Sequence, residues 1–252
     1  MLIDTHCHLL STEYDDVNEI IKHTFTSGID KIIINGFDVE SSKEAVKLAN
    51  EYKNVYAAVG IGPENVTDIT DEMINTINNL SNNKKVVAIG EIGLDYYWTI
   101  DNKTKQNYVF EKMLEIANQK KLPIIVHSRK SINDVYNKVK KYNIKGIMHC
   151  FSSSLEMANE FIKLGFLIGI GGVVTFKNSK EIKKIVEKIE LKNISLETDS
   201  PYLSPEPKRG TINVPFNLIY IVNKIAEIKG VNTNNVVEET TNAVMSIIDF
   251  NC

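Results

Sequence analysis

Short apolar runs alternate with amphipathic stretches from one end of the chain to the other. Several of the runs, such as 31–35 and 166–170, are almost continuously apolar, which is typical of a strand buried on both faces of a parallel sheet. The runs predicted to be strands lie at residues 2–4, 31–35, 55–60, 86–90, 123–127, 146–149, 166–170 and 194–197.

The stretches between these runs have helical periodicity. Val17, Ile21 and Phe25 fall on one face of a predicted helix. The sequence Ser-Ser-Lys-Glu at 41–44 is interpreted as a capping box that opens a helix through Tyr52. Further helices are predicted at about 70–82, 104–121, 131–142, 154–164, 179–188, 215–229 and 234–249.

Strict strand–helix alternation predicts a parallel sheet, and eight repeats allow it to close into a (β/α)8 TIM barrel. An open, doubly wound sheet is the structural alternative. Its dinucleotide-binding version is disfavoured, because no Gly-x-Gly-x-x-Gly follows the first run. The chain has no low-complexity linker and no break in composition, so we expect one domain over residues 1–252.

Composition indicates the compartment and the class of partner more than the reaction. The net charge is −3, so no basic field is available to attract a long duplex, although bound metal ions would add local positive charge. Cys7, Cys150 and Cys252 are few and widely spaced, which argues against a disulfide framework and for a reducing compartment. No basic leader and no apolar run of about 20 residues is present. We therefore expect a cytoplasmic monomer that does not enter a membrane.

Chemistry in a barrel of this type sits at the C-terminal ends of the strands. The metal-ligating residue types predicted at those ends are His6, His8, Glu91, His127, His149 and Asp199. The two histidines of His-x-His project to the same side of an extended segment, because side chains alternate with period two. The alternative, a set of hydrogen-bonded core residues, is disfavoured because six such groups would be costly to bury without a metal.

Imidazole and carboxylate ligands suit zinc, manganese, iron or nickel better than calcium. A carboxylate such as Glu91 can bridge two divalent ions (zinc, manganese, magnesium or a similar metal), and a pair about 3.5–4 Å apart would suit displacement at phosphorus. Asp199 is predicted to be the catalytic proton acceptor for the attacking water.

Two arginines are candidates for substrate binding. Arg129 follows His127 by two residues, so it is predicted to face the same mouth and to contact a substrate phosphate, the alternative being a salt bridge to Asp95. The aromatic residues at 96–98 either stack on a base or pack their own loop. Arg209 lies on a proline-containing loop and either neutralises the substrate or is a solvated loop residue.

Five motifs occur in order along the chain: Thr-His-Cys-His-Leu at 5–9, Gly-Glu-Ile-Gly-Leu-Asp-Tyr-Tyr at 90–97, His-Ser-Arg at 127–129, His-Cys-Phe at 149–151 and Glu-Thr-Asp-Ser-Pro-Tyr-Leu at 197–203. Together they resemble the TatD family of metal-dependent deoxyribonucleases, in the amidohydrolase superfamily of barrels. The resemblance extends to Thr-Thr-Asn-Ala at 240–243, close to the end of the chain.

The resemblance implies two ions that share Glu91, one held with His6, His8 and Asp199 and the other with His127 and His149. It also implies a 3′-to-5′ exonuclease or related phosphodiesterase that acts on DNA ends or short nucleic acids.

The chain departs from the family pattern at two loops. Gly62 replaces the histidine of Gly-x-His-Pro, and Ile212 and Val214 replace an arginine and a glutamate of Arg-Gly-x-Arg-Asn-Glu-Pro. The absence of the histidine, arginine and glutamate side chains weakens the prediction that the substrate is DNA more than the prediction that the protein is a hydrolase. Two alternatives therefore stay open: a metal-dependent hydrolase of a carboxylic ester, lactone or amide on the same barrel, and a non-catalytic metal-binding protein.

Overall fold

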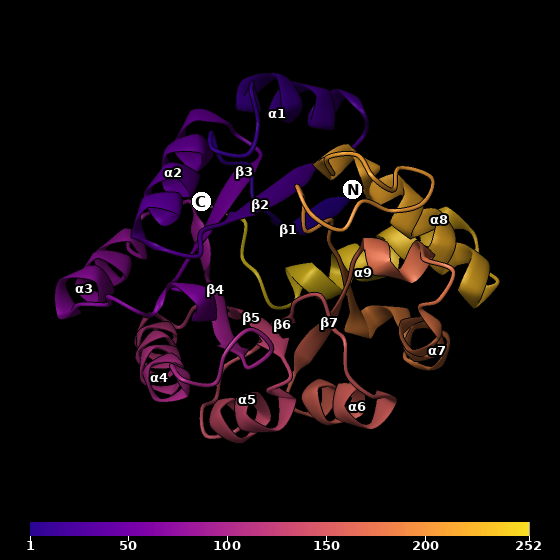
Figure 1. The fold of residues 1–252 in the computed structure, drawn as a ribbon. Helices are drawn as coiled ribbons and strands as arrows, with labels where there is room; N and C mark the ends of the chain where they lie inside the picture. Colours follow the sequence, from indigo (N-terminus) through magenta and orange to yellow (C-terminus); the bar gives the residue numbers. More distant parts are fainter. Residues whose placement is uncertain (252) are drawn as a thin grey trace.

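The computed structural model describes residues 1–251. Over this range the strands form one parallel sheet in which each pairs with the next along the chain, and the helices surround it (Figure 1). The strands are β1 (Ile3–Cys7), β2 (Lys31–Asn35), β3 (Val55–Val59), β4 (Val86–Asp95), β5 (Ile124–Arg129), β6 (Gly146–Met148), β7 (Phe166–Ile170) and β8 (Ile194–Leu196). The predicted (β/α)8 barrel is confirmed.

The barrel closes where β1 meets the segment that follows β8. The Asp199 N–H donates to the His6 carbonyl at 2.9 Å, and the His8 N–H donates to the Ser200 carbonyl at 2.7 Å. These hydrogen bonds bring the two ends of the predicted site into contact, although nearly 200 residues separate them in sequence.

The helices follow the predicted periodicity: α1 (Val17–Thr26), α2 (Val39–Glu51), α3 (Asp71–Leu80), α4 (Lys103–Lys120), α5 (Ile132–Val139), α6 (Leu155–Lys163), α7 (Lys180–Lys188), α8 (Leu218–Lys229) and α9 (Thr233–Met245). The capping-box prediction at 41–44 was wrong. Asp38 is the N-cap of α2. Its carboxylate accepts from the Ser41 N–H at 2.8 Å, and its own N–H donates to the Ser41 hydroxyl oxygen at 3.0 Å. The helix therefore begins at Val39, because an Asp cap upstream satisfies its first N–H groups.

No helix within residues 1–251 combines the length and apolar character needed to cross a membrane.

The interior of the barrel is apolar and is closed at one end by the C-terminal segment. Ile33, Ile125 and Ile147 pack inside the sheet against Val244, in the last turn of α9, and Ile248, which follows that helix. Figure 1 shows α9 and the chain end beyond it. The Thr241 hydroxyl donates to the Met1 carbonyl, directly before β1. The segment therefore covers the N-terminal ends of the strands, and the opposite ends carry the polar side chains described below.

Two strands are longer and less regular than predicted. β4 continues to Asp95, and its pairing with β5 shifts register between Ile89 and Ile92. Glu91 thus lies inside β4 rather than at its end, and its N–H donates to the Gly36 carbonyl at 2.6 Å. The pairing of β1 with β2 shifts in the same way between Asp4 and Cys7, around His6. Irregularities of this kind re-aim a side chain out of the regular alternation.

Candidate metal centre

The six side chains predicted as ligands converge on one end of the barrel. They come from β1 and the residue after it, from β4 and β5, and from the residues that follow β6 and β8. Their donor atoms form three overlapping triads with spacings suited to a metal ion: His6 with His8 and Glu91, His6 with His149 and Asp199, and Glu91 with His127 and His149.

Glu91 lies between two sets of histidines. Its Oε2 is 3.4 Å from Nε2 of both His6 and His8. Its Oε1 is 2.9 Å from Nδ1 of His127 and 4.0 Å from Nε2 of His149. One carboxylate therefore presents one oxygen to each half of the cluster, which is the geometry of a bridging ligand.

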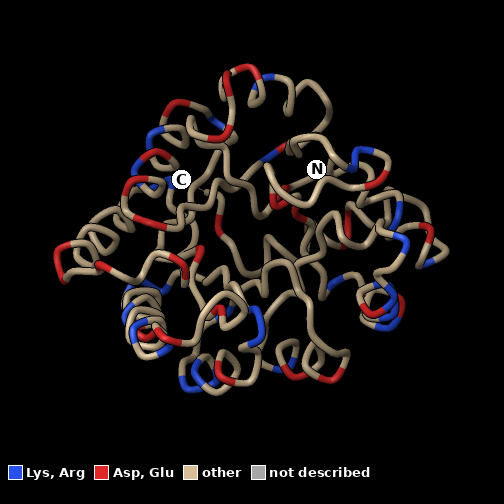
Figure 2. Tube along the Cα trace, in the orientation of Figure 1, with Lys and Arg blue, Asp and Glu red and all other residues tan. Residues whose placement is uncertain are grey.

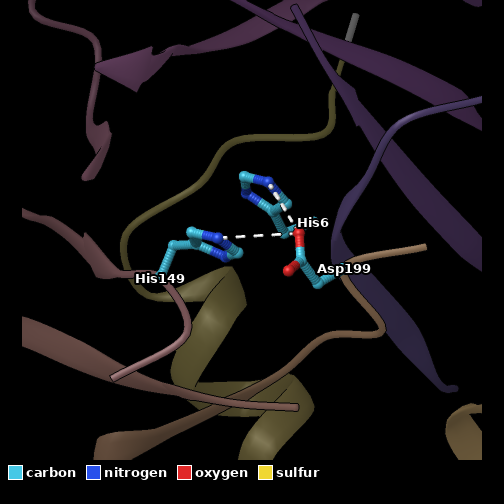
Figure 3. A group of neighbouring side chains, drawn as sticks. All are labelled: His6, His149 and Asp199. Carbon is cyan, nitrogen blue, oxygen red and sulfur yellow. Dashed lines mark ion pairs between the residues drawn. The ribbon is translucent and has the colours of Figure 1, made fainter. Parts of the chain in front are cut away.

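Asp199 faces the same histidines from the segment after β8 (Figure 3). Its Oδ1 is 3.7 Å from Nε2 of His6 and of His8, and 3.6 Å from Nε2 of His149. Its backbone lies in the left-handed region at φ 56°, which aspartate tolerates better than most residues. The hydrogen bond from its N–H to the His6 carbonyl helps to hold that conformation.

Acceptors outside the centre contact three of the histidines. His8 Nδ1 is 2.8 Å from the Asn35 carbonyl, His127 Nε2 is 3.1 Å from Asp95 Oδ2, and His149 Nδ1 is 3.3 Å from Glu197 Oε1. In a neutral imidazole, the hydrogen bonds of His8 and His127 put the proton on the outer nitrogen, whereas His149 Nδ1 faces Glu197 without forming a hydrogen bond. The lone pair of the inner nitrogen is then directed at the centre, as metal-ligating histidines require.

Both carboxylates of the cluster stay ionised despite their burial. Burial opposes ionisation of Glu91, but hydrogen bonds with His127 and His6 outweigh it and hold its pKa well below the ordinary value. Burial likewise opposes ionisation of Asp199, and the charge of His149 with the His8 hydrogen bond lowers its pKa. Burial and the neighbouring His149 lower the pKa of His6 to about 4, which favours its neutral, ligating form.

The spacing of the donors fits a divalent ion. Tetrahedral coordination at about 2.1 Å places neighbouring ligand atoms about 3.4 Å apart. From Nε2 of His6 and of His8, Glu91 Oε2 lies 3.4 Å away and Asp199 Oδ1 lies 3.7 Å away.

The buried Nδ1 of His6 has no hydrogen-bond partner among the described residues, so this ring is held by packing, stacked on His149 with the ring centroids 3.5 Å apart.

The two candidate substrate-binding arginines differ in their surroundings. The Arg129 guanidinium carbon lies 3.6 Å from the centroid of the Tyr97 ring, and the predicted alternative of an ion pair with Asp95 is absent from residues 1–251. Arg209 is exposed on the β8–α8 loop. Its guanidinium packs 3.9 Å from the centroid of the Phe176 ring and reaches the Ser204 carbonyl at 3.4 Å.

The positions that depart from the family pattern have different surroundings. A Cβ at Gly62 would lie 3.4 Å from the Phe37 Cβ, so the backbone there has room for a Cβ atom. Ile212 is 63% exposed, whereas Val214 packs against the core. Asn213, between them, is fully buried and donates to the carbonyls of residues 198 and 202, both at 2.8 Å.

Sequence reasoning missed the residues that support the ligands. Glu197 had a signal, because it precedes Asp199 by two residues and so shares its face of an extended segment. Asp95 was considered only as a partner of Arg129. Regular alternation along β4 places Asp95 on the same face as Glu91, four residues earlier, so its contact with His127 also had a signal. Asn35 ends β2 and acts through its backbone carbonyl, which no side-chain pattern reveals.

The chain is similar to known proteins over nearly its whole length. The family model for TatD-related DNase matches residues 3–249. A metal-dependent hydrolase of Bacillus subtilis strain 168, YabD, is 38% identical over 255 residues, covering 100% of both chains. The metal-dependent hydrolase BU355 of Buchnera aphidicola subsp. Acyrthosiphon pisum is 34% identical, covering 99% of both chains.

Among solved structures, the TatD homologue YjjV of Escherichia coli K12 superposes with a TM-score of 0.89 at 26% identity, covering 98% of this chain and 97% of the other. The chain belongs to the TatD family of metal-dependent hydrolases.

Proposed function

We propose that this protein is a metal-dependent phosphodiesterase that removes nucleotides from the 3′ end of DNA. The observation that carries the proposal is the position of Glu91, whose two oxygens face separate sets of histidines. A shared carboxylate between two donor sets suits the binding of two divalent ions at a distance that clamps both the attacking and the leaving oxygen of a phosphodiester.

Bound divalent ions would supply a Lewis acid that lowers the pKa of a water molecule and offsets the charge that develops at phosphorus. His6, His8 and Asp199 would hold one ion, and His127 and His149 the other. Asp199 directs Oδ1 at the histidines, which leaves Oδ2 to accept the proton from the attacking water. Its lowered pKa keeps it unprotonated and ready for that role.

Arg129 supports a phosphate substrate, because it follows His127 by two residues on β5 and its guanidinium contacts the Tyr97 ring without an ion-pair partner among residues 1–251. Lysines and arginines lie mainly on the outer helices and loops, while acidic positions also occur near the barrel axis (Figure 2). With a net charge of −3, the protein has no broad basic field, so contact with DNA would be local and confined to a strand end.

The test is hydrolysis of single-stranded DNA in Mg²⁺ or Mn²⁺ with the label at either end. Removal from the 3′ end predicts immediate release of mononucleotide from a 3′-labelled strand and a shortening ladder from a 5′-labelled one. Asp199→Asn and a chelator should each abolish both signals. The control is Asp134→Asn, which replaces a half-exposed carboxylate on α5 and should leave both signals unchanged.

Failure to cut DNA would refute the proposal. Turnover of carboxylic esters, lactones or amides would then support the alternative hydrolase. Bound metal without turnover of any ester would support a non-catalytic protein.

A further inference from the structure

Large apolar side chains are exposed on two loops at the same end of the barrel as the metal centre. Of the exposed large hydrophobic residues within 1–251, Tyr97, Trp98 and Ile100 lie between β4 and α4, and Tyr202 and Ile212 lie between β8 and α8. Trp98 is 68% exposed. An exposed indole on a loop at this end of the barrel is a candidate surface for a partner, because its burial would be favourable.

Arg129 joins this aromatic loop to the metal centre. It lies two residues after His127 on β5, and its guanidinium carbon is 3.6 Å from the ring centroid of Tyr97 and 5.2 Å from that of Trp98. The two rings meet edge to face, with their centroids 4.9 Å apart. Stacking fixes the plane of the guanidinium, and no carboxylate of residues 1–251 pairs with it. Its N–H groups are therefore available to an added anion.

Asp95 fixes the loop relative to the centre. Its Oδ1 accepts from the Tyr97 N–H at 2.7 Å, while its Oδ2 contacts His127 Nε2 at 3.1 Å. A surface recess of about 500 Å³ adjoins the loop and is lined by Trp98 and by the carboxylates Asp95 and Glu64, together with hydroxyl and amide side chains of Thr67, Thr99 and Asn102. The recess thus combines an aromatic face with polar groups.

We propose that Trp98 and Tyr97 form a stacking subsite for an unpaired nucleobase next to the scissile phosphate, with Arg129 binding that phosphate. The inference rests on the proposed phosphodiesterase function. An unpaired base fits because it offers a flat face to the indole and polar edges to the recess. Arg129, whose guanidinium carbon is 5.2 Å from the Trp98 ring centroid, would be available to the phosphate attached to that base. A base inside a duplex cannot expose its face in this way.

Trp98 is the only tryptophan of the chain, so its fluorescence reports on this subsite alone. Oligothymidylate of four residues, titrated into full-length Asp199→Asn protein to prevent cleavage, is expected to quench that fluorescence with saturation. A tetramer of the same backbone without bases is expected to leave it unchanged. Equal quenching by both tetramers, or quenching by neither, would overturn the proposal.

Kinetics supply the second readout. Because stacking on one aromatic ring contributes about ten-fold or more to binding, Trp98→Ala should raise KM for single-stranded DNA about ten-fold with little change in kcat. A strand whose terminal nucleotides lack bases should show no difference, and Trp98→Phe should recover most of the loss. Tyr108→Ala, which removes an exposed ring on α4, is the matched control. At 68% exposure, replacement of Trp98 should leave the fold intact.

The two proposals fail differently. DNA cleavage that is the same in wild type and Trp98→Ala would refute the stacking subsite and leave the phosphodiesterase in place. Base-dependent quenching of Trp98 without any DNA cleavage would refute the phosphodiesterase and support the subsite.

Discussion

Replacing Asp95 by asparagine should weaken one metal position and spare the other. Asp95 is buried, and its two oxygens accept from two donors, His127 Nε2–H and the Tyr97 N–H. An asparagine has one oxygen and one NH2 group, so either orientation sets its NH2 against one of these donors. If the NH2 faces His127, the imidazole must move its proton to Nδ1, the nitrogen that faces Glu91 at 2.9 Å.

The change would then place a proton where a ligand lone pair is required. Loss of such a supporting contact costs about 10- to 100-fold in metal affinity, equivalent to about 1.4–2.8 kcal/mol. Calorimetric titration of the metal-free protein with Zn²⁺ or Mn²⁺ should show this loss for the ion held by His127 and His149. The ion held by His6 and His8 should bind nearly as in wild type. Asp134→Asn is the matched control. Unchanged affinity of both ions, or equal weakening of both, would refute the assigned role of Asp95.

Gly93→Ala should destabilise the fold by about 2–4 kcal/mol, because its Cβ would lie 2.0 Å from the His127 carbonyl oxygen. Gly62→Ala, at φ −72° and with room for a Cβ, should instead stabilise it by about 0.4–1 kcal/mol. Chemical denaturation measures both, and similar losses would contradict this account of the two glycines. Arg129→Ala should lower kcat/KM on DNA by about 10- to 100-fold, and Arg129→Lys should recover only part, since lysine lacks the planar fork. An unchanged kcat/KM for Arg129→Ala would exclude it from phosphate binding. Divalent metal at about 100 times its Kd should raise the free energy of unfolding by about 2.7 kcal/mol. Calorimetry with and without chelator tests this, and an unchanged melting temperature would argue against a metal centre.

The alternation of apolar runs and amphipathic stretches was sufficient to predict the barrel. Strands buried on both faces carry a continuous apolar signal, and eight strands at short intervals leave few other ways to bury them. Boundaries were less predictable. The start of α2 depended on a choice between cap residues, and the extension of β4 beyond Glu91 depended on pairing with β5. Pairing between strands is a tertiary interaction, which a local pattern does not specify.

The candidate ligands were predictable because most histidines of the chain serve this site. Of the five histidines, four lie at the mouth of the barrel. The family resemblance also implied that Glu91 is shared between two sets of histidines, which local patterns alone do not specify. The support of His127 by Asp95, four residues beyond Glu91, was not predicted. The stacking of Arg129 on Tyr97, rather than pairing with Asp95, likewise follows from the path of a loop.

Release of nucleotide from a 3′-labelled single strand tests the central claim most directly. The wild-type protein in Mg²⁺ or Mn²⁺ should release labelled mononucleotide, and both Asp199→Asn and removal of the metal should stop the release. An intact strand in the presence of bound metal, or release that persists without metal, would contradict the account.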